Sequence, residues 1–243
     1  MGEANLYDIY LWKKLMKYNR PKLNEDNIRL KIIEIGRRLF KEGVVFGTWG
    51  NLSARLDNNS FLITPSGFAK GELQPSDLLI VDLSGKVVKG NLRPSIETTL
   101  HAKIYKRRMD VGGIIHTHPT FCTSFAICMK EIPIVSVDAA AVIGEKIPVA
   151  KYYPPGSEEL ADEVVNILRD GVAVLLANHG LITVGKNLEE AYHAVIVAEN
   201  EARILVFSHL IGTPKELQKE EIEALRAYYE TKYGQNGKLI VRY

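Results

Sequence analysis

The chain has 243 residues and a net charge of +2, with 46% hydrophobic and 25% charged residues. This length allows one large domain or two small ones, and the composition suits an ordinary buried core. So small a charge argues against nucleic acid or a membrane surface as a partner. Cys122 and Cys128 are the only cysteines, which indicates a reducing compartment. With no signal peptide and no apolar run of roughly 18 residues, we expect a soluble cytoplasmic protein.

Two helices are predicted at the N-terminal end. Residues 5–18 carry apolar side chains at roughly helical spacing, and we interpret residues 1–24 as a helical extension. Residues 26–41 form the second predicted helix, which ends before Gly43. Its apolar stripe consists of Ile28, Ile32, Ile35 and Leu39. Residues 25–243 are expected to form a single catalytic domain.

Short strands follow, arranged as hairpins. The segments "NLSARL" and "FLITPSG" flank the turn sequence "DNNS", and residues 77–90 form a second hairpin that turns at Ser84 and Gly85. Residues 95–108 are predicted to be helical, with Ser95 as the N-cap directly after Pro94.

The second half of the chain continues to mix strands and helices. The predicted elements are a strand at 111–118, a helix near 120–130, two strands within 172–185, a helix at 188–210 and a charged helix at 215–230. In the helix at 188–210 the inward-facing residues are Ala191, Val195, Ala198, Ala202 and Leu205. Hairpins interleaved with helices predict an α/β fold, a three-layer sandwich with a central mixed, largely antiparallel sheet and helices on both faces.

Three histidines are candidates for metal ligands. His116 and His118 lie two residues apart in a predicted strand, so both side chains point to one face and can reach one ion. The pair alone is weak evidence, since one histidine could be a core group and the other exposed. His179 lies where the two strands of 172–185 join, a position typical of sites and equally of a capping hydrogen bond. Three histidine ligands would leave a tetrahedral zinc with one open position, as in catalytic sites.

Glu97 is the candidate acid/base. It lies near the start of the predicted helix at 95–108, where the helix dipole favours a carboxylate whether or not that carboxylate is functional. His101 follows one turn later on the same face, so Glu97 and His101 form an alternative metal-binding pair.

Small residues in three segments could bind an anion. Backbone N–H groups of such turns, and of a helix N-terminus, bind phosphate, although each is equally ordinary turn chemistry. The sequence has no Rossmann or P-loop phosphate motif. The candidates are Gly47, Gly50 and Asn51, then Ser66 and Gly67, then Ser95.

In their order along the chain, five segments resemble the class II aldolase/adducin family. They are "GTWGNLSARL", "FLITPSG", "RPSIETTLHAKIY", "IIHTHP" and "LLANHGLITVG", and the resemblance runs from about Arg29 to Leu210. It implies one Zn²⁺ per subunit, ligated by His116, His118 and His179 and approached by Glu97, which serves as acid/base. It places Gly50, Asn51, Ser66, Gly67 and Ser95 at the substrate phosphate.

The same resemblance implies a reaction and an assembly. We expect a homotetramer with active sites between subunits that reversibly cleaves a ketose 1-phosphate, such as L-fuculose 1-phosphate, to dihydroxyacetone phosphate and lactaldehyde. Tyr233 matches a tail tyrosine that protonates the aldehyde oxygen. In two places the sequence departs from the family pattern. Ile96 replaces a second serine, and Val137 and Asp138 stand where fuculose enzymes carry a tyrosine.

Other family activities remain open. A ribulose-5-phosphate 4-epimerase would carry an aspartate in place of Glu97, so the glutamate favours an aldolase. A methylthioribulose-1-phosphate dehydratase uses the same three histidines. A metal-free module like the adducin head is expected to have lost them, whereas His116, His118 and His179 are all present.

Overall fold

The computed structural model describes residues 24–232, in which eight strands form one sheet. The strand order is β4-β3-β2-β1-β5-β8-β7-β6, and all neighbours are antiparallel except the parallel pair β6 and β7. The strands are β1 Asn51–Arg55, β2 Ser60–Ile63, β3 Leu79–Asp82, β4 Val87–Lys89, β5 Gly113–Thr117, β6 Val149–Ala150, β7 Ala173–Leu176 and β8 Gly180–Gly185. The predicted extension, apart from Asn24, lies outside the described residues.

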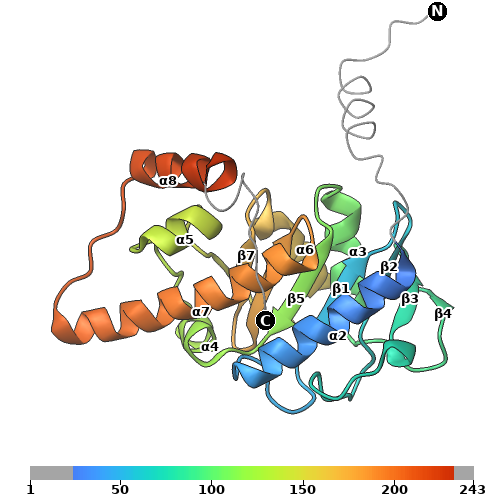
Figure 1. Ribbon diagram of the computed structural model, residues 1–243. Helices are drawn as coiled ribbons and strands as arrows, with labels where there is room; N and C mark the ends of the chain where they lie inside the picture. The colour runs from blue at the N-terminus through green and yellow to red at the C-terminus, as the bar shows by residue number, and fades with distance from the viewer. Residues whose placement is uncertain (1–23, 233–243) are drawn as a thin grey trace, which may run out of the picture.

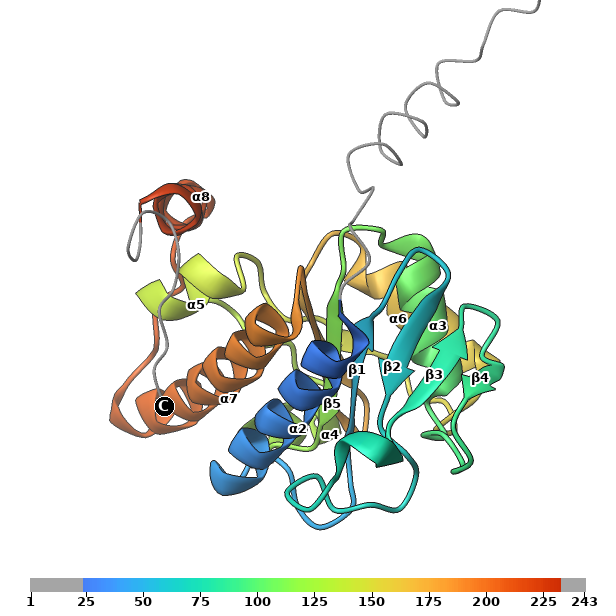
Figure 2. The same cartoon turned by 45° about the vertical axis from the view of Figure 1, so that its right-hand side comes forward.

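Helices cover both faces of this sheet (Figures 1 and 2). They are α2 Glu25–Lys41, α3 Thr98–Arg107, α4 Thr120–Ile127, α5 Val137–Val142, α6 Glu158–Leu168, α7 Leu188–Ile211 and α8 Lys219–Thr231, with a 3₁₀ turn at Pro75–Asp77. Because side chains alternate along a strand, Ile115 of β5 packs with α2 and α7, whereas its neighbour Ile114 packs with α3 and α6. The predicted three-layer α/β sandwich is confirmed.

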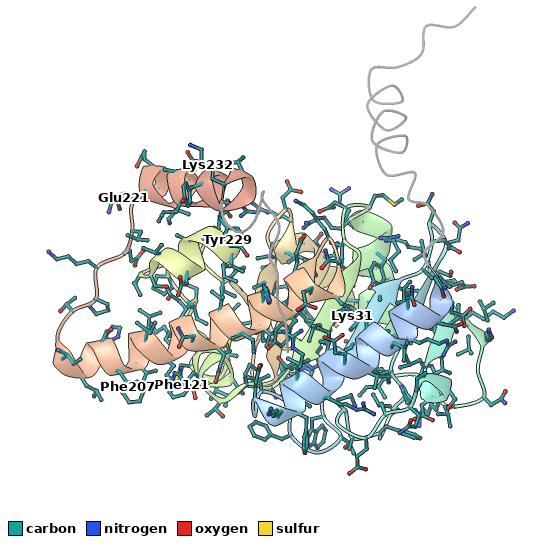
Figure 3. All side chains as sticks on the ribbon, in the orientation of Figure 1. Lys31, Phe121, Phe207, Glu221, Tyr229 and Lys232 are labelled. Carbon is teal, nitrogen blue, oxygen red and sulfur yellow. The ribbon has the colours of Figure 1, made fainter. Side chains whose placement is uncertain are left out.

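A third apolar cluster joins the C-terminal helices to the sheet edge. Phe121 of α4 meets Phe207 of α7 with ring centroids 6.0 Å apart (Figure 3). In Figure 2, α5 lies between α7 and α8, and Ile222 and Leu225 of α8 pack against this cluster. No helix of residues 24–232 has the length and apolar character needed to cross a membrane.

The predicted start of α3 is wrong. The helix begins at Thr98 with Glu97 as its N-cap, not at Ser95. Ser95 is held in a short extended pairing instead, since its N–H donates to Thr64 O at 3.3 Å beside the Pro65–Pro94 bridge. Its carbonyl then accepts the N–H of Thr98 at 3.1 Å, which forms a turn ahead of the helix.

Two other helix boundaries differ from the predicted ones for local reasons. The predicted helix near 120–130 ends at Ile127, because Met129 takes a left-handed φ of 55°. The charged helix begins at Lys219 rather than near 215, because Leu217 N–H donates to Ile134 O at 2.9 Å. The predicted hairpins and the helix at 188–210 are confirmed, whereas α5, α6 and β6 were not predicted.

Candidate metal centre

Strand geometry brings His116, His118 and His179 together. His116 is near the end of β5, His118 follows that strand by one residue, and His179 precedes β8. The ring centroids lie 4.7 to 4.8 Å apart in all three pairings. Nitrogen atoms of the three rings all lie within 4.8 Å of one another. The predicted pairing of His116 and His118 on one strand face, with His179 as the third member, therefore matches the geometry.

The hydrogen bonds of His116 fix which of its nitrogens faces the cluster with a lone pair. Its Nδ1 lies 2.9 Å from Leu181 O, and a carbonyl oxygen can only accept. Nδ1 therefore carries the proton, and Nε2 presents a lone pair 2.8 Å from Nε2 of His118. A backbone carbonyl that orients the far nitrogen is the arrangement found behind metal-bound histidines.

Burial keeps the imidazoles neutral. It lowers the pKa of His116 to about 3, and it also lowers the pKa of His118. Burial, and secondarily the neighbouring His116, lowers the pKa of His179 to about 4. Neutral imidazoles are the form that binds metal ions, so no proton has to leave these three rings near neutral pH.

Glu97 supplies a carboxylate at the edge of this cluster. Its Oε2 lies 3.2 Å from Nε2 of His116, and its Oε1 lies 3.6 Å from Nε2 of His179. The side chain is buried, and Asn51 Nδ2 donates to Oε2 at 2.7 Å. Oε1 is buried without a hydrogen-bond partner in the described part of the chain. Asn51 thus holds Oε2 in place, whereas Oε1 is left able to accept a hydrogen bond or a metal ion.

These residues fit a divalent metal ion. Lone pairs of the His116 nitrogen and the carboxylate oxygens face one another at short range, which is unfavourable unless a proton or a cation lies between them. The unpaired, buried Oε1 of Glu97 points to the same need. No cysteine takes part, and three histidines with a nearby carboxylate are a donor set of catalytic metal sites.

The loop before β1 closes one side of the centre. Trp49 stacks on His118 with ring centroids 6.1 Å apart, although its side chain is largely exposed. Gly50, with φ +77°, lies against the strand that carries His116. A Cβ at position 50 would meet His116 O at 2.6 Å, so only glycine allows this approach.

Replacing Gly50 by alanine is expected to destabilise the protein more than replacing Gly67. Both glycines have left-handed φ, +77° and +78°, but a Cβ at position 67 would meet nothing within 4 Å. Gly67→Ala should cost about 1 kcal/mol from backbone strain alone, whereas Gly50→Ala adds the collision with His116 O and should cost about 2–3 kcal/mol. Urea unfolding measures both, and equal losses would contradict the close approach at Gly50.

The predicted phosphate-binding residues come from two adjoining segments, the loop before β1 and the first residue of β1. Ser66 N–H donates to Arg93 O at 3.0 Å, and Ser95 N–H donates to Thr64 O, which places Ser66 and Ser95 on paired backbone. Ser95 Oγ also accepts the N–H of Glu97 at 3.3 Å. The phosphate role of Gly50, Asn51, Ser66, Gly67 and Ser95 stays a prediction. The contact between Asn51 and Glu97 was not predicted.

His101 does not join the metal cluster. It is fully buried, and its Nδ1 lies 2.6 Å from Ser53 Oγ, which in turn lies 2.8 Å from the Tyr105 hydroxyl. Among residues 24–232 the histidines that group around a common point are His116, His118 and His179. The alternative metal pair of Glu97 and His101 therefore finds no support.

Acid should unfold the protein partly through His101. Burial lowers its pKa to about 3, whereas an unfolded histidine titrates near 6.5. Below about pH 6.5 the unfolded chain binds the extra proton, so stability is lost as the pH falls from there toward 3. His101→Gln, which cannot titrate, should show a shallower fall in the urea midpoint. An identical pH dependence in both proteins would refute this contribution.

The match to a known family adds to this geometry. Residues 30–206 match the family model described as Class II Aldolase and Adducin N-terminal domain. The chain belongs to this class II aldolase and adducin family. A solved structure of an L-fuculose 1-phosphate aldolase superposes with a TM-score of 0.80 at 33% identity, covering 84% of this chain and 96% of that one.

Several relatives of this chain carry different enzyme names. An L-fuculose phosphate aldolase of Methanococcus maripaludis is 37% identical, over 72% of this chain and 93% of the relative. A 5-deoxy-D-ribulose 1-phosphate aldolase of Bacillus thuringiensis is 35% identical, over 85% and 97%. A 3-oxo-tetronate 4-phosphate decarboxylase of Haemophilus influenzae is 33% identical, over 71% and 84%. This class II aldolase family member is therefore an enzyme of the aldolase class, a carbon–carbon lyase.

Proposed function

We propose that the protein is a zinc-dependent sugar-phosphate aldolase. It would reversibly cleave a ketose 1-phosphate, such as L-fuculose 1-phosphate, to dihydroxyacetone phosphate and a short aldehyde such as lactaldehyde. The observation that carries the proposal is the set of three neutral histidines around one point, with the open carboxylate oxygen of Glu97 beside them. His116, His118 and His179 would hold the ion. When bound, zinc supplies a Lewis acid that stabilises negative charge on substrate oxygens.

Glu97 is the proposed acid/base. In the direction of synthesis, Oε1 takes the proton from the carbon next to the carbonyl of dihydroxyacetone phosphate. That carbon then forms the new bond to the aldehyde carbon, and Tyr233 gives a proton to the aldehyde oxygen. Asn51 supports this role for Glu97, because its donated hydrogen bond to Oε2 leaves Oε1 as the oxygen free to accept. Tyr233 lies outside the described residues.

Substrate phosphate is proposed to bind the glycine and serine turns around the centre. Gly50 lies against the strand of His116, and Ser95 hydrogen-bonds the backbone of Glu97. A phosphate held there would place the adjacent carbonyl near the histidines. Such positioning would favour phosphorylated substrates over unphosphorylated ones.

A homotetramer with active sites between subunits is part of the proposal. Apolar side chains exposed at the end of α7 support it, since Leu210 is 79% and Ile211 90% exposed and a partner subunit would cover them. Light scattering of the purified protein measures the subunit number.

A reducing cytoplasm is the proposed location. The two cysteines are free thiols, which fits it.

A condensation assay tests the reaction. The zinc-loaded protein is incubated with dihydroxyacetone phosphate and a panel of aldehydes that includes lactaldehyde, and the products are identified. We expect a ketose 1-phosphate with a new carbon–carbon bond. Absence of any such product, together with epimerisation of ribulose 5-phosphate, dehydration of methylthioribulose 1-phosphate or decarboxylation of an oxo-acid phosphate, would overturn the proposal.

A further inference from the structure

Lys70 is a buried cation that the proposed chemistry does not use. It lies in the turn after β2 and is only 1% exposed. Its backbone packs tightly on α2, because a Cβ at Gly36 would meet Lys70 O at 2.8 Å. Lysine is almost never fully buried unless its ammonium group has a partner of opposite charge. The position therefore calls for an explanation.

The ammonium group of Lys70 joins two loops. Its Nζ donates to Thr48 O at 2.9 Å and to Phe68 O at 2.6 Å. Thr48 precedes Gly50 in the loop that touches the metal centre, and Phe68 follows the turn of Ser66 and Gly67. Lys70 thus ties together two of the segments proposed to hold the substrate phosphate.

The ammonium group of Lys70 lacks an acidic partner in the described part of the chain. Within residues 24–232 Lys70 has no carboxylate partner, and its two acceptors are neutral carbonyls. Burial lowers the pKa of Lys70 to about 8, which still leaves most of the side chain protonated at neutral pH. Its charge also reaches the metal centre, since it contributes to the low pKa of His116. The charge of Lys70 thus acts on His116, while its ammonium group forms no ion pair with Glu97 or another carboxylate of the described residues.

We propose that Lys70 is a positioning residue for the substrate phosphate. It holds the Thr48 and Phe68 loops in the arrangement that receives the anion, and its positive charge is balanced by the phosphate when substrate binds. A dianion next to a buried ammonium gains far more than it would in water, because the surroundings screen the attraction weakly. The proposal rests on the proposed function, since it names a residue of the same phosphate site.

The test compares Lys70→Met and Lys70→Gln with Lys106→Met. Methionine removes both the charge and the hydrogen bonds, whereas glutamine keeps N–H donors without the charge. Lys106 is exposed at the far end of α3 from Glu97, so its variant controls for net charge alone. Binding of inorganic phosphate is measured by titration calorimetry on zinc-loaded protein, with KM and kcat for dihydroxyacetone phosphate as a second measurement.

Both Lys70 variants should bind inorganic phosphate at least about tenfold more weakly than wild type. KM for dihydroxyacetone phosphate should rise more than kcat falls, and Lys106→Met should match wild type. Unchanged phosphate affinity in folded Lys70→Met or Lys70→Gln would overturn the proposal, even if melting temperature fell. So would a wild-type protein that binds no phosphate. Phosphate titration requires no turnover. The role of Lys70 in phosphate binding can therefore be tested even if the protein does not catalyse the aldol reaction.

Discussion

Glu97→Gln is expected to fold like the wild-type protein and to turn over about a thousandfold more slowly, within the range that general acid–base groups contribute. In the wild-type protein Asn51 Nδ2 donates to Oε2 of Glu97 at 2.7 Å, and the amide oxygen of a glutamine can accept the same hydrogen bond. It cannot take a proton from carbon, and its NH₂ group takes the position of Oε1, which lies 3.6 Å from Nε2 of His179. The condensation assay measures turnover, and far-ultraviolet circular dichroism measures whether the variant folds like wild type.

Glu201→Gln is the matched control, because Glu201 is a nearly inaccessible glutamate like Glu97. It is 1% exposed and accepts N–H groups from Val135 at 2.6 Å and Ser136 at 3.1 Å. These bonds fix the chain before α5 and have no part in the centre, so the variant should lose stability and keep its turnover number. Full turnover in Glu97→Gln, or equal loss of turnover in both variants, would refute the role of Glu97.

Much of the candidate metal centre could be predicted because it depends on local geometry. Alternation along one strand already places His116 and His118 on one face, and the turn between β7 and β8 places His179 at a strand end. The α3 boundary depended on more than local signals. Ser95 has the side chain of an N-cap, but its backbone pairs with Thr64, and that tertiary contact moved the helix start to Thr98.

Contacts set by strand register could not be predicted. Asn51 reaches Glu97 because β1 pairs with β5 in the register that sets Asn51 opposite His116. Nothing in the segment "NLSARL" reveals that register. Lys70 likewise looks like a surface lysine in "FAKGEL", and only the packing of its turn on α2 buries it. By contrast, α6 was missed although Ser157 and the first-turn acid Glu158 are ordinary helix-start signals.

Removing one ligand should abolish metal binding together with activity. His179 is the best choice, because its side chain is 14% exposed whereas His116 is held in the core of β5. We expect His179→Ala to bind zinc at least about a hundredfold more weakly, since loss of an orienting partner alone already costs ten- to a hundredfold. Metal analysis after gel filtration should give about one zinc per wild-type subunit and less than about a tenth in the variant.

Thermal unfolding separates a metal site from a merely polar pocket. An ion that binds only the folded state stabilises it by about 4 kcal/mol at a thousandfold excess over Kd. Zinc should therefore raise the melting temperature of chelator-treated wild type and leave His179→Ala unchanged. His209→Ala is the matched control, because that histidine bonds Leu205 O at 2.7 Å near the end of α7. It should respond to zinc like wild type, because His209 is not one of the three clustered imidazoles proposed to hold the ion. Retention of zinc by His179→Ala, or full turnover of wild type after chelation, would exclude the three histidines as the catalytic metal site.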